Sequence, residues 1–487
     1  MVRARVPAGD WPHLRPAPPG RTLPEVWAAR WAAQPDAPAL IDGWDSARVL
    51  DAATLHARTA GAATALAERG VGAGDRVLWC ARATLSSIEA LLGVLRAGAV
   101  LVPVSPSATG PELGHVVADA RPVLAICDRD RPDAFGGGPV LLGVEELARA
   151  AGRTQPVAGP DRQPDDDALI VYTSGTTGKP KGAVHTHASL LAGASALLTA
   201  WEWTSEDRLV HCLPLFHVHG LCAGLFGTLA AGASAAVFDR FDEAAILGAA
   251  GAGTMFFGVP TMYHRLAATG EASALGALRL CVSGSAPLAP DLWQRLSRVG
   301  VGVLERYGMT ETLLTLSNPL VGERRPGSVG VPLPGVEAAL DDADENGIGE
   351  LLVRGAPLCR GYWGRDDFLS GGWFGTGDLV SVADDGYVTV RGRRTELIIT
   401  GGHNVYPAEV EAVLSRHPGV VEVAVVGEAS DEWGETVVAY VVGDPDLASL
   451  RDLAAAELAP FKCPRELRRI DALPRNALGK VVRGELR

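Results

Sequence analysis

The sequence lacks the features of a membrane, secreted or nucleic-acid-binding protein. No run approaches the ~18 consecutive apolar residues that span a bilayer, and the Arg- and Pro-rich stretch from Met1 to Pro19 has no apolar core of a signal peptide. The seven cysteines are odd in number and lack paired spacing, which argues against a disulfide framework. The net charge of −13 argues against a nucleic-acid partner. We therefore expect a cytoplasmic protein with neither a membrane nor a nucleic-acid partner.

The sequence does contain enough apolar residues for a large core. Of its 487 residues, 47% are hydrophobic and 21% are charged, which is ordinary for a globular protein of up to three domains. The apolar spacing predicts amphipathic helices over Leu23–Ala33 and Leu50–Arg69. A predicted strand (Arg76–Cys80), helix (Ser87–Ala97) and strand (Ala99–Val104) then alternate. This alternation predicts an α/β fold, with a parallel sheet covered by helices.

A loop rich in glycine and threonine follows the apolar run Ala168–Tyr172. Glycines let a backbone come close to a ligand, and free N–H groups, hydroxyls and lysines can surround a phosphate chain. Because Pro180 follows Lys179, the pattern of a P-loop ATPase or kinase fails. A simple turn after a strand is the alternative. The candidate phosphate-binding residues of the loop are Thr173, Ser174, Gly175, Thr176, Thr177, Gly178, Lys179 and Lys181.

Further short motifs are spread over the rest of the chain. Each combines glycines with charged or hydroxyl side chains, and several follow a predicted strand. In order they are Val282–Pro287 (VSGSAP), Glu305–Glu311 (ERYGMTE), Gly375–Leu379 (GTGDL), Arg391–Glu396 (RGRRTE), Gly401–Glu411 (GGHNVYPAEVE) and Pro474–Lys480 (PRNALGK).

In this order the motifs resemble those of the adenylate-forming superfamily, which includes acyl-CoA synthetases, peptide-synthetase adenylation domains and luciferases. The resemblance runs from about Pro24 to the C-terminus. It implies a large N-terminal domain of α/β subdomains with a β-barrel-like part, and a small mobile α+β C-terminal domain. It places the domains at 1–392 and 397–487, with a hinge at 393–396.

The resemblance implies ATP and Mg²⁺ as cofactors and assigns roles to motif residues. Tyr307 would stack on adenine, Thr310 would touch the α-phosphate, and Glu311 would bind Mg²⁺, which prefers carboxylate and phosphate oxygens. Asp378 and Arg393 would contact the ribose. The other implied nucleotide-binding residues are Ser285, Ala286, Glu305, Gly308 and Met309.

The C-terminal motifs imply coenzyme A as the second substrate. Lys480 stands where the family has its adenylation lysine, and by family analogy it is also a candidate for acetylation. Gly401, Gly402 and His403 would approach the pantetheine arm of coenzyme A. At the hinge this chain has Thr395, where the family usually has Lys or Asp, so a charged hinge contact is missing.

These roles imply a reaction in two steps. A carboxylate attacks the α-phosphate of ATP to give acyl-AMP and pyrophosphate, with Lys480, Thr310 and Glu311 as catalytic residues. A thiol then attacks the adenylate. Because the two steps need different partners at one place, the small domain would rotate about the hinge.

Two arginines favour a small diacid as the substrate. Arg306 replaces the glycine that many fatty- and aryl-acid relatives have, and Arg265 lies in the helix expected to line the acyl pocket. A guanidinium pairs well with a second carboxylate, and these segments resemble malonyl-CoA synthetases. We therefore predict malonate, with methylmalonate tolerated. The other acyl-pocket candidates are His217, Ser283, Gly284 and Met309.

Three alternatives stay open. Phe216–His219 has no aspartate for a substrate ammonium, which disfavours amino acids but not other short, medium-chain or aryl acids. The acceptor could be a carrier protein in place of coenzyme A. The histidines of His211–His219 could bind a metal, but only Cys212 is a further ligand there, so we favour His217 as a gate.

Overall fold

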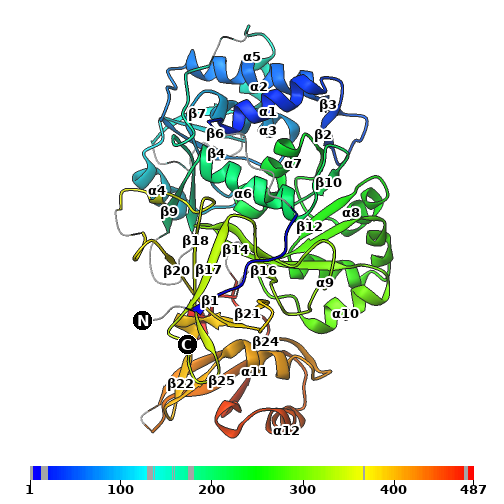
Figure 1. Ribbon diagram of the computed structural model, residues 1–487, viewed down its shortest axis with the longest axis vertical. Helices are drawn as coiled ribbons and strands as arrows, with labels where there is room; N and C mark the ends of the chain where they lie inside the picture. Colours follow the sequence, from blue (N-terminus) through cyan, green and yellow to red (C-terminus); the bar gives the residue numbers. More distant parts are fainter. Residues whose placement is uncertain are drawn as a thin grey trace. The chain divides into compact units, whose positions relative to one another are not determined.

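The structure is a computed structural model that describes residues 4–12, 20–128, 135, 138–155, 157, 159–173, 180–365, 368–430, 432–475 and 481–486 (Figure 1). The chain forms two compact units. The larger comprises Pro7–Glu337 and Val353–Phe374, and the smaller comprises Met1–Val6, Ala338–Leu352 and Gly375–Arg487. This division follows the packing, and the predicted boundary at 393–396 stays a prediction.

The first part of the larger unit is a seven-stranded sheet in the order β19-β9-β8-β5-β4-β6-β7. Its central strands are parallel, whereas β9 runs antiparallel to both β8 and β19. The elements are α1 (Leu23–Ala33), α2 (Ala52–Ala67), β4 (Arg76–Cys80), α3 (Leu85–Arg96), β5 (Val100–Pro103), α4 (Gly110–Ala120), β6 (Leu124–Cys127), β7 (Val140–Gly143), α5 (Val144–Ala151), β8 (Asp167–Thr173), β9 (Lys181–Thr186) and β19 (Gly361–Tyr362).

The second part is a nine-stranded sheet in the order β16-β15-β14-β13-β12-β10-β11-β2-β3, again with parallel strands at its centre. Its strands are β2 (Pro38–Asp42), β3 (Val49–Asp51), β10 (Arg208–His211), β11 (Ser234–Val237), β12 (Met255–Gly258), β13 (Leu280–Ser283), β14 (Val303–Met309), β15 (Leu313–Ser317) and β16 (Val331–Pro332). Its helices are α6 (His187–Ala200), the π-helix η2 (His219–Phe226), α7 (Gly227–Ala231), α8 (Glu243–Ala250), α9 (Pro260–Ala268), the 3-10 helix η3 (Ala272–Ala277) and α10 (Pro290–Arg298).

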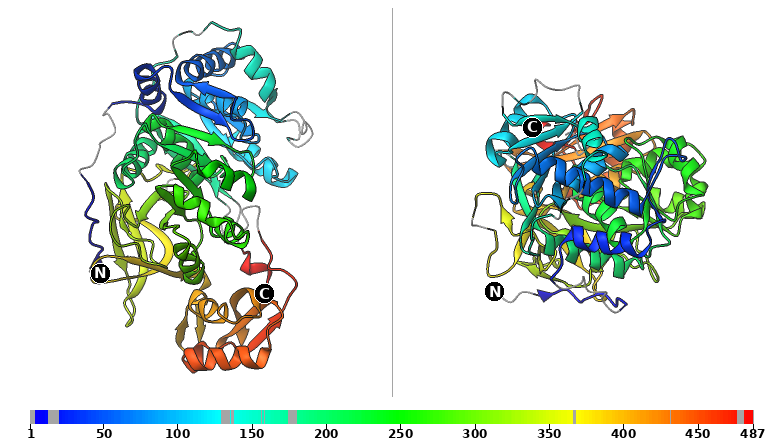
Figure 2. Two further views of the ribbon diagram at one scale, coloured as in Figure 1. Left: turned by 90° about the vertical axis from the view of Figure 1, so that its right-hand side faces the viewer. Right: turned by 90° about the horizontal axis from the view of Figure 1, so that it is seen from above.

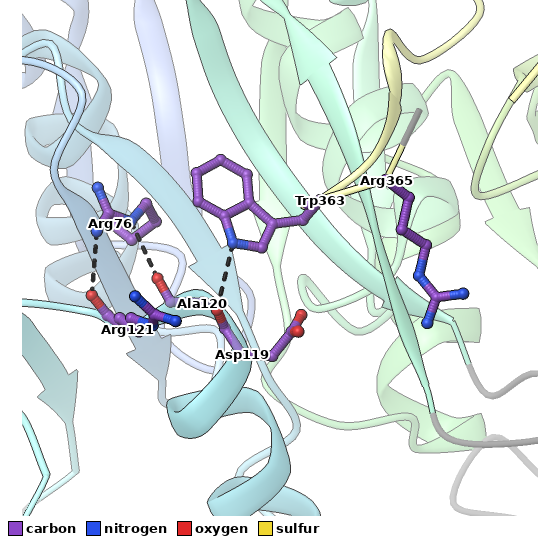
Figure 3. A pocket seen from close by; sticks show the side chains of 7 residues that line it. Arg76, Asp119, Ala120, Arg121, Trp363 and Arg365 are labelled. Atoms are coloured by element: carbon purple, nitrogen blue, oxygen red, sulfur yellow. Dashed lines mark hydrogen bonds between the residues drawn. The ribbon is translucent and has the colours of Figure 1, made fainter. Parts of the chain in front are cut away.

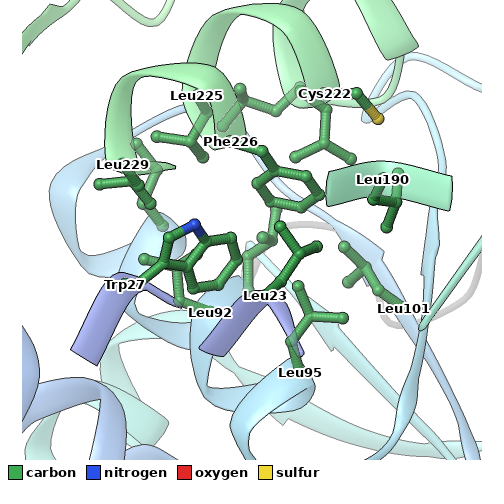
Figure 4. Packing of buried hydrophobic residues seen from close by; sticks show 14 of the residues in the cluster. Leu23, Trp27, Leu92, Leu95, Leu101, Leu190, Cys222, Leu225, Phe226 and Leu229 are labelled. Carbon is green, nitrogen blue, oxygen red and sulfur yellow. The ribbon is translucent and has the colours of Figure 1, made fainter. Parts of the chain in front are cut away.

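One hydrophobic core joins the two sheets of the larger unit. Trp27 of α1 is fully buried, and its ring centroid lies 5.2 Å from that of Phe226 (Figure 4). Leucines from α3, α6 and α7 surround this pair. Because a fully buried leucine or phenylalanine stabilises a fold by about 1.5–3 kcal/mol, this core holds the site-bearing strands in place.

The smaller unit contains two sheets. The first has the order β1-β17-β18-β20-β21, and the second has the order β23-β22-β25-β24 with β26 beside β25. Helices α11 and α12 lie against the second sheet (Figure 2). Val410, Leu414 and Leu450 of these helices belong to the hydrophobic core that the helices share with the sheet. The elements are β1 (Ala4–Arg5), β17 (Val336–Asp341), β18 (Ile348–Gly355), β20 (Phe374–Val382), β21 (Val388–Arg393), the 3-10 helix η4 (Arg394–Glu396), β22 (Ile398–Thr400), β23 (His403–Val405), α11 (Pro407–Leu414), β24 (Val420–Ser430), β25 (Gly434–Gly443), α12 (Leu447–Glu457), the 3-10 helix η5 (Pro460–Lys462), β26 (Glu466–Arg469) and the 3-10 helix η6 (Arg483–Glu485).

The predicted α/β class and the first predicted elements are confirmed. The helix Leu23–Ala33 and the strand Arg76–Cys80 have the predicted bounds. The helix expected from Leu50 begins only at Ala52, because the Asp51 side chain accepts the Thr54 N–H and caps it, while Val49–Asp51 forms β3. None of the helices that the structure describes is both long and apolar enough to cross a membrane.

Candidate active site

Strand β14, the third strand from one edge of the nine-stranded sheet, carries residues 305–309 of the ERYGMTE motif, and Thr310 and Glu311 follow it. It pairs in parallel with β13 and antiparallel with β15, and its register shifts between Tyr307 and Gly308. A Cβ at Gly308 would lie 1.9 Å from the Leu313 carbonyl oxygen, so only glycine fits there. Tyr307, Met309 and Thr310 are half-exposed at the end of the strand. The motif therefore presents its predicted nucleotide-binding side chains at an accessible sheet end.

Glu311 is a buried carboxylate beside Tyr362. The Tyr362 hydroxyl donates a hydrogen bond to Glu311 Oε1 (2.7 Å), and the Lys181 Nζ lies 5.0 Å from the centroid of the Tyr362 ring. Burial, together with the nearby Glu311 charge, raises the pKa of Tyr362, so the phenol stays a donor. The structure thus brings the predicted Lys181 and Glu311 together, and it adds Tyr362, which the sequence interpretation missed.

Glu311 fits the predicted magnesium role in its chemistry. A buried carboxylate oxygen suits this hard cation, which takes one or two protein carboxylates and completes its shell with water and substrate phosphates. Within the described part of the chain, no three His, Cys, Asp or Glu side chains gather into a metal-ligating group.

Thr310 is positioned through its backbone. His185 Nε2 donates to the Thr310 carbonyl oxygen (2.7 Å), and burial lowers the pKa of His185 to about 4, so the ring is neutral. The Cys359 N–H donates to the Glu311 carbonyl (2.8 Å). These two bonds hold the turn after β14 and leave the Thr310 side chain part-exposed.

Glu305 joins two loops. Its Oε1 accepts the Gly327 N–H (2.8 Å), and its Oε2 accepts the Leu288 N–H (3.4 Å). Asn318 Nδ2 donates to the backbone oxygens of both Glu305 and Ser328, at 2.9 and 2.6 Å. Burial raises the pKa of Glu305 to about 7. In this structure Glu305 therefore supports the loops around the predicted nucleotide site.

The turn after β13 contains the other predicted nucleotide-binding pair, Ser285 and Ala286, both exposed. Ser285 has a φ of 72°, a left-handed conformation that non-glycine residues adopt rarely. Such strain persists only where the surroundings impose it, and it is common at ligand-binding turns.

Arg306 is the most unusual group of the site. It is 4% exposed, and its Nε and Nη2 atoms are buried without a hydrogen-bond partner. Burial lowers its pKa to about 9. Its guanidinium lies over Gly284, where a Cβ would come within 2.4 Å of Arg306 Nε. A buried guanidinium without a counter-charge is costly, so its place in the fold indicates an anionic ligand.

Three more polar groups, from Ser283, His211 and His219, are buried in the larger unit. The Ser283 Oγ and both ring nitrogens of His211 and of His219 lack hydrogen-bond partners. Burial lowers the pKa of His211 to about 4; burial and then the Arg306 charge lower that of His219, so both rings are neutral. Because native structures contain few such groups, each needs a ligand or water as its partner.

The sequence interpretation considered His211 and His219 only as metal ligands. His219 begins the π-helix η2, and its ring stacks on Phe257 with centroids 6.2 Å apart. Short π-helical segments are frequent at functional sites. His217, the predicted gate, is half-exposed beside Phe216, with ring centroids 4.4 Å apart. The histidine-rich stretch therefore presents one half-exposed ring and two buried neutral rings.

Arg265 does not lie where the sequence interpretation placed it. Its side chain is 55% exposed on α9, its Nε lies 2.5 Å from Glu243 Oε1, and its guanidinium lies over Phe241. The predicted pair of buried guanidinium groups is thus corrected to one, Arg306, because Glu243 already neutralises Arg265 in this structure.

The predicted ribose ligands lie together in the smaller unit. Asp378 and Arg393 are cross-strand partners of β20 and β21, and Arg393 Nε lies 2.7 Å from Asp378 Oδ1. Asp378 is 5% exposed, and its N–H donates to Thr376 Oγ1 (3.1 Å). The sheet register therefore places an acceptor and a donor next to each other.

The predicted coenzyme A-binding glycines form the turn of the β22–β23 hairpin, where Thr400 pairs with His403. Gly401 and Gly402 have φ angles of 54° and 79°, which favour glycine. Aromatic residues contact this turn: the His403 ring stacks on Phe461 (4.5 Å between centroids), and the Gly401 N–H donates to the Trp433 backbone carbonyl (2.9 Å).

Part of the prediction falls outside the described residues, namely Ser174, Gly175, Thr176, Thr177, Gly178, Lys179 and Lys480. The phosphate-loop candidates that are described, Thr173 and Lys181, are cross-strand partners at the ends of β8 and β9, and Thr173 Oγ1 donates to the Lys181 carbonyl (3.4 Å).

A separate pocket of about 600 Å³ in the larger unit is lined by Arg76, Asp119, Arg121, Trp363 and Arg365, among others. Arg76 donates to the carbonyls of Ala120, Arg121 and Gly74, and Trp363 Nε1 donates to that of Asp119 (Figure 3). These bonds satisfy the carbonyls at the end of α4, and Arg365 points away from Arg76. The arrangement has a structural explanation as a helix cap.

Comparison with known proteins gives the family. The chain matches the model of the AMP-binding enzyme over residues 27–363 and that of the AMP-binding enzyme C-terminal domain over 409–480. It is 37% identical to a malonate–CoA ligase of Arabidopsis thaliana (85% of this chain, 78% of the relative) and 36% identical to a feruloyl-CoA synthase of an Amycolatopsis species (89% and 93%). The ATP-bound crystal structure of MatB from Rhodopseudomonas palustris is 36% identical and covers 96% of this chain and 98% of its own, with a TM-score of 0.91. The chain therefore belongs to the AMP-binding enzyme family, and it contains both the AMP-binding region and the C-terminal domain of that family.

Proposed function

We propose that this protein is an ATP-dependent acid–CoA ligase that activates malonate as its adenylate and transfers the malonyl group to coenzyme A, releasing AMP and pyrophosphate. The observation that carries this proposal is the buried Arg306 guanidinium, whose Nε and Nη2 have no partner. The similarity to the malonate–CoA ligase of Arabidopsis thaliana and to MatB supports it.

Malonate has two carboxylates, and the proposal gives them different roles. One attacks the α-phosphate of ATP. The other accepts hydrogen bonds from Arg306 Nε and Nη2, and Ser283 and His219 are further donors to it, because the neutral His219 ring can donate from one nitrogen. Neutral histidines leave the positive charge on the arginine alone. A methyl group on the central carbon adds no charge, so methylmalonate is the expected second substrate.

Arg265 remains a proposed second contact to the diacid. It would have to leave Glu243, to which it is bonded in this structure. An exposed ion pair contributes only about 0–1 kcal/mol, so the exchange of Glu243 for a substrate carboxylate is energetically accessible.

In the first half-reaction the chain positions anions. Tyr307 would stack on adenine, with Ser285, Ala286, Gly308 and Met309 beside it, and Asp378 and Arg393 would hold the ribose. Thr173–Lys181 would surround the phosphates, and Thr310 would hold the α-phosphate. Bound through Glu311, Mg²⁺ would neutralise charge on the phosphates. Lys480, which lies outside the described residues, would bridge the carboxylate and the α-phosphate.

In the second half-reaction the coenzyme A thiol would displace AMP. We propose that residues 397–487 rotate about a hinge at 393–396, which withdraws Lys480 and brings Gly401, Gly402 and His403 to the adenylate. His217, which is half-exposed, is the proposed gate between the acid and the thiol.

One experiment tests the proposal: a thioester assay with ATP, coenzyme A and acids of matched length, either mono- or dicarboxylic. We expect malonyl-CoA, AMP and pyrophosphate, with propionate and butyrate as poor substrates. Production of ADP, or equal rates with monocarboxylic acids of the same length, would contradict the proposal. Omitting coenzyme A and adding a carrier protein separates the two acceptors.

An aryl acid is the second candidate substrate, because the feruloyl-CoA synthase relative is as similar as MatB. Arg306 disfavours it, since an uncharged ring would leave the buried guanidinium without a counter-charge. Including ferulate in the same assay decides between the two.

Two further proposals concern the cell. The seven cysteines are all free thiols, which supports a reducing compartment such as the cytoplasm. Acetylation of Lys480 would remove the charge that the first step needs, and mass spectrometry of cell-derived protein would detect it.

A further inference from the structure

Hydrogen bonds and apolar contacts hold the residues on both sides of 476–480 in place. Arg475 and Val481 form an antiparallel bridge, and the Val482 N–H donates to the Pro474 carbonyl (2.8 Å). Leu473 and Leu486 are buried against Val426, Val438 and Tyr440 of the second sheet. The two ends of the segment that contains Lys480 therefore lie next to each other on β24 and β25.

Arg483 binds two carboxylates at this position. Its Nη2 lies 2.8 and 3.0 Å from the two carboxylate oxygens of Glu411, and its Nη1 lies 3.1 Å from Glu396 Oε2. Burial acts to lower the pKa of Arg483, but Glu411 and Glu396 outweigh it, so the pKa is raised. Glu411 Oε1 also accepts the Val425 N–H (2.8 Å). One guanidinium thus joins the tail to α11 and β24 and to the turn η4.

The two ends of η4 are bound to different parts of the smaller unit. Arg394 Nη1 lies 2.7 Å from Glu350 Oε2 on β18, and Glu350 Oε1 accepts the Gly377 N–H of β20 (3.0 Å). Glu396 instead binds Arg483 of the tail. The exposed Thr395 is the residue between these two attachments.

We propose that Arg483 is a positioning residue for the adenylation half-reaction: it joins the tail after Lys480, helix α11 and Glu396 into one body that turns against the β18–β20 sheet at Thr395. The proposal rests on the proposed function, because it uses the role of Lys480 in acyl-adenylate formation. It also explains how a hinge residue without a charge can work, since the charged contacts belong to its two neighbours.

The two half-reactions separate this role from general support of the fold. A side chain that positions Lys480 is needed for ATP–pyrophosphate exchange, but it is not needed when acyl-AMP is supplied. We expect Arg483→Ala to lower malonate-dependent exchange by about 100-fold and to change thioester formation from supplied malonyl-AMP by less than about threefold. Arg483→Lys, which keeps the positive charge, should recover part of the exchange rate.

A matched control removes an arginine from the same region without touching the tail. Arg416 pairs with Glu457 at 2.8 Å, and both side chains are more than 40% exposed. Arg416→Ala should leave both half-reactions unchanged. Should Arg483→Ala fail to fold, Glu396→Gln removes one of the two carboxylates that bind Arg483. The rates of the two half-reactions can then be compared in that variant.

Hydrogen exchange gives a readout that does not depend on the substrate. Arg483→Ala should speed amide exchange in the C-terminal peptide that contains Val482, and Arg416→Ala should not. If wild-type protein forms no acyl-adenylate with any acid, the proposed function fails. The amide hydrogen-exchange data would still test whether Arg483 holds the C-terminal segment in place. Two results would overturn the positioning role of Arg483. One is an equal loss of rate in both half-reactions of Arg483→Ala, and the other is an unchanged rate of amide hydrogen exchange in the C-terminal peptide.

Discussion

Two arginines in this protein, one buried and one half-buried, have opposite surroundings. Arg306 in the larger unit is 4% exposed, and two of its nitrogens lack a partner. Arg483 in the smaller unit is bonded to both Glu396 and Glu411. Burying an unpaired charge costs several kcal/mol, whereas a paired one is largely compensated. We therefore expect a ligand at the unpaired arginine, whereas the paired arginine links separate segments of the chain.

We expect the largest effect from removal of the unpaired arginine, Arg306. Arg306→Ala should lower kcat/KM for malonate by about 30- to 5000-fold, the equivalent of about 2–5 kcal/mol for the loss of one partner of a buried charge pair. Any activity with propionate should stay similar. Thioester kinetics with both acids measure this, and equal losses on the two acids would reject Arg306 as the diacid contact. Removal of the buried charge should also raise the free energy of unfolding.

Glu305 sharpens the comparison, because backbone N–H groups, and not an opposite charge, satisfy this buried carboxyl. Its folded-state pKa of about 7 lies above its ordinary value, so the folded state binds its proton more tightly than the unfolded state does. Its contribution to stability is therefore full below about pH 4.5 and is lost as pH rises to about 7, by up to about 3 kcal/mol.

Glu305→Gln should remove this loss, since glutamine imitates the protonated carboxyl. Urea unfolding at a series of pH values from 5 to 8 measures the free energy of unfolding of both proteins. The variant should gain stability relative to the parent as pH rises, and parallel curves would show that Glu305 does not titrate in this range.

Tyr362→Phe tests the buried carboxylate of Glu311, to which the described residues contribute one side-chain donor. Loss of the hydroxyl leaves Glu311 Oε1 without its 2.7 Å partner, so the free energy of unfolding should fall by about 1.5–3 kcal/mol. Saturating Mg²⁺ and ATP should reduce the difference, because the cation would neutralise Glu311. Calorimetry with and without Mg²⁺–ATP checks both statements, and a difference that is unaffected by Mg²⁺–ATP would count against Glu311 as the metal ligand.

The smallest effect concerns Arg265, the exposed arginine. Arg265→Ala and Glu243→Ala should each change the free energy of unfolding by less than about 1 kcal/mol. Arg265→Ala should lower malonate kcat/KM less than Arg306→Ala does, because Arg265 must first leave Glu243. If Arg265 binds the substrate, Arg265→Ala will lower malonate kcat/KM and Glu243→Ala will not. Identical effects of the two variants on kcat/KM would show that Arg265 serves only in the surface ion pair.

Features that depend on a local residue pattern could be predicted from the sequence. The helix over Leu23–Ala33, the strand Arg76–Cys80 and the α/β class follow from apolar spacing, and all three are confirmed. The family follows from motifs, whose residues are contiguous. The placement of Asp378 beside Arg393 could not be read from spacing, because it depends on the pairing of two strands.

Contacts across the fold could not be predicted. Glu243 and Arg265 are 22 residues apart, and Tyr362 and Glu311 are 51 apart, so neither pair has a local signal. The Glu243–Arg265 bond leaves Arg306 as the one buried guanidinium of the predicted pair in this structure. The buried His219 begins the π-helix η2, whose wide turn no residue pattern in the sequence indicated.

The seven thiols have a practical consequence. Six are buried, and Cys463, beside the η5 turn of the smaller unit, is the one with partial exposure. A maleimide dye should therefore attach at a single native position without any engineered cysteine, although slowly, because burial raises the pKa of Cys463. The protein thus comes with its own attachment point for a fluorescence probe of the C-terminal region during turnover.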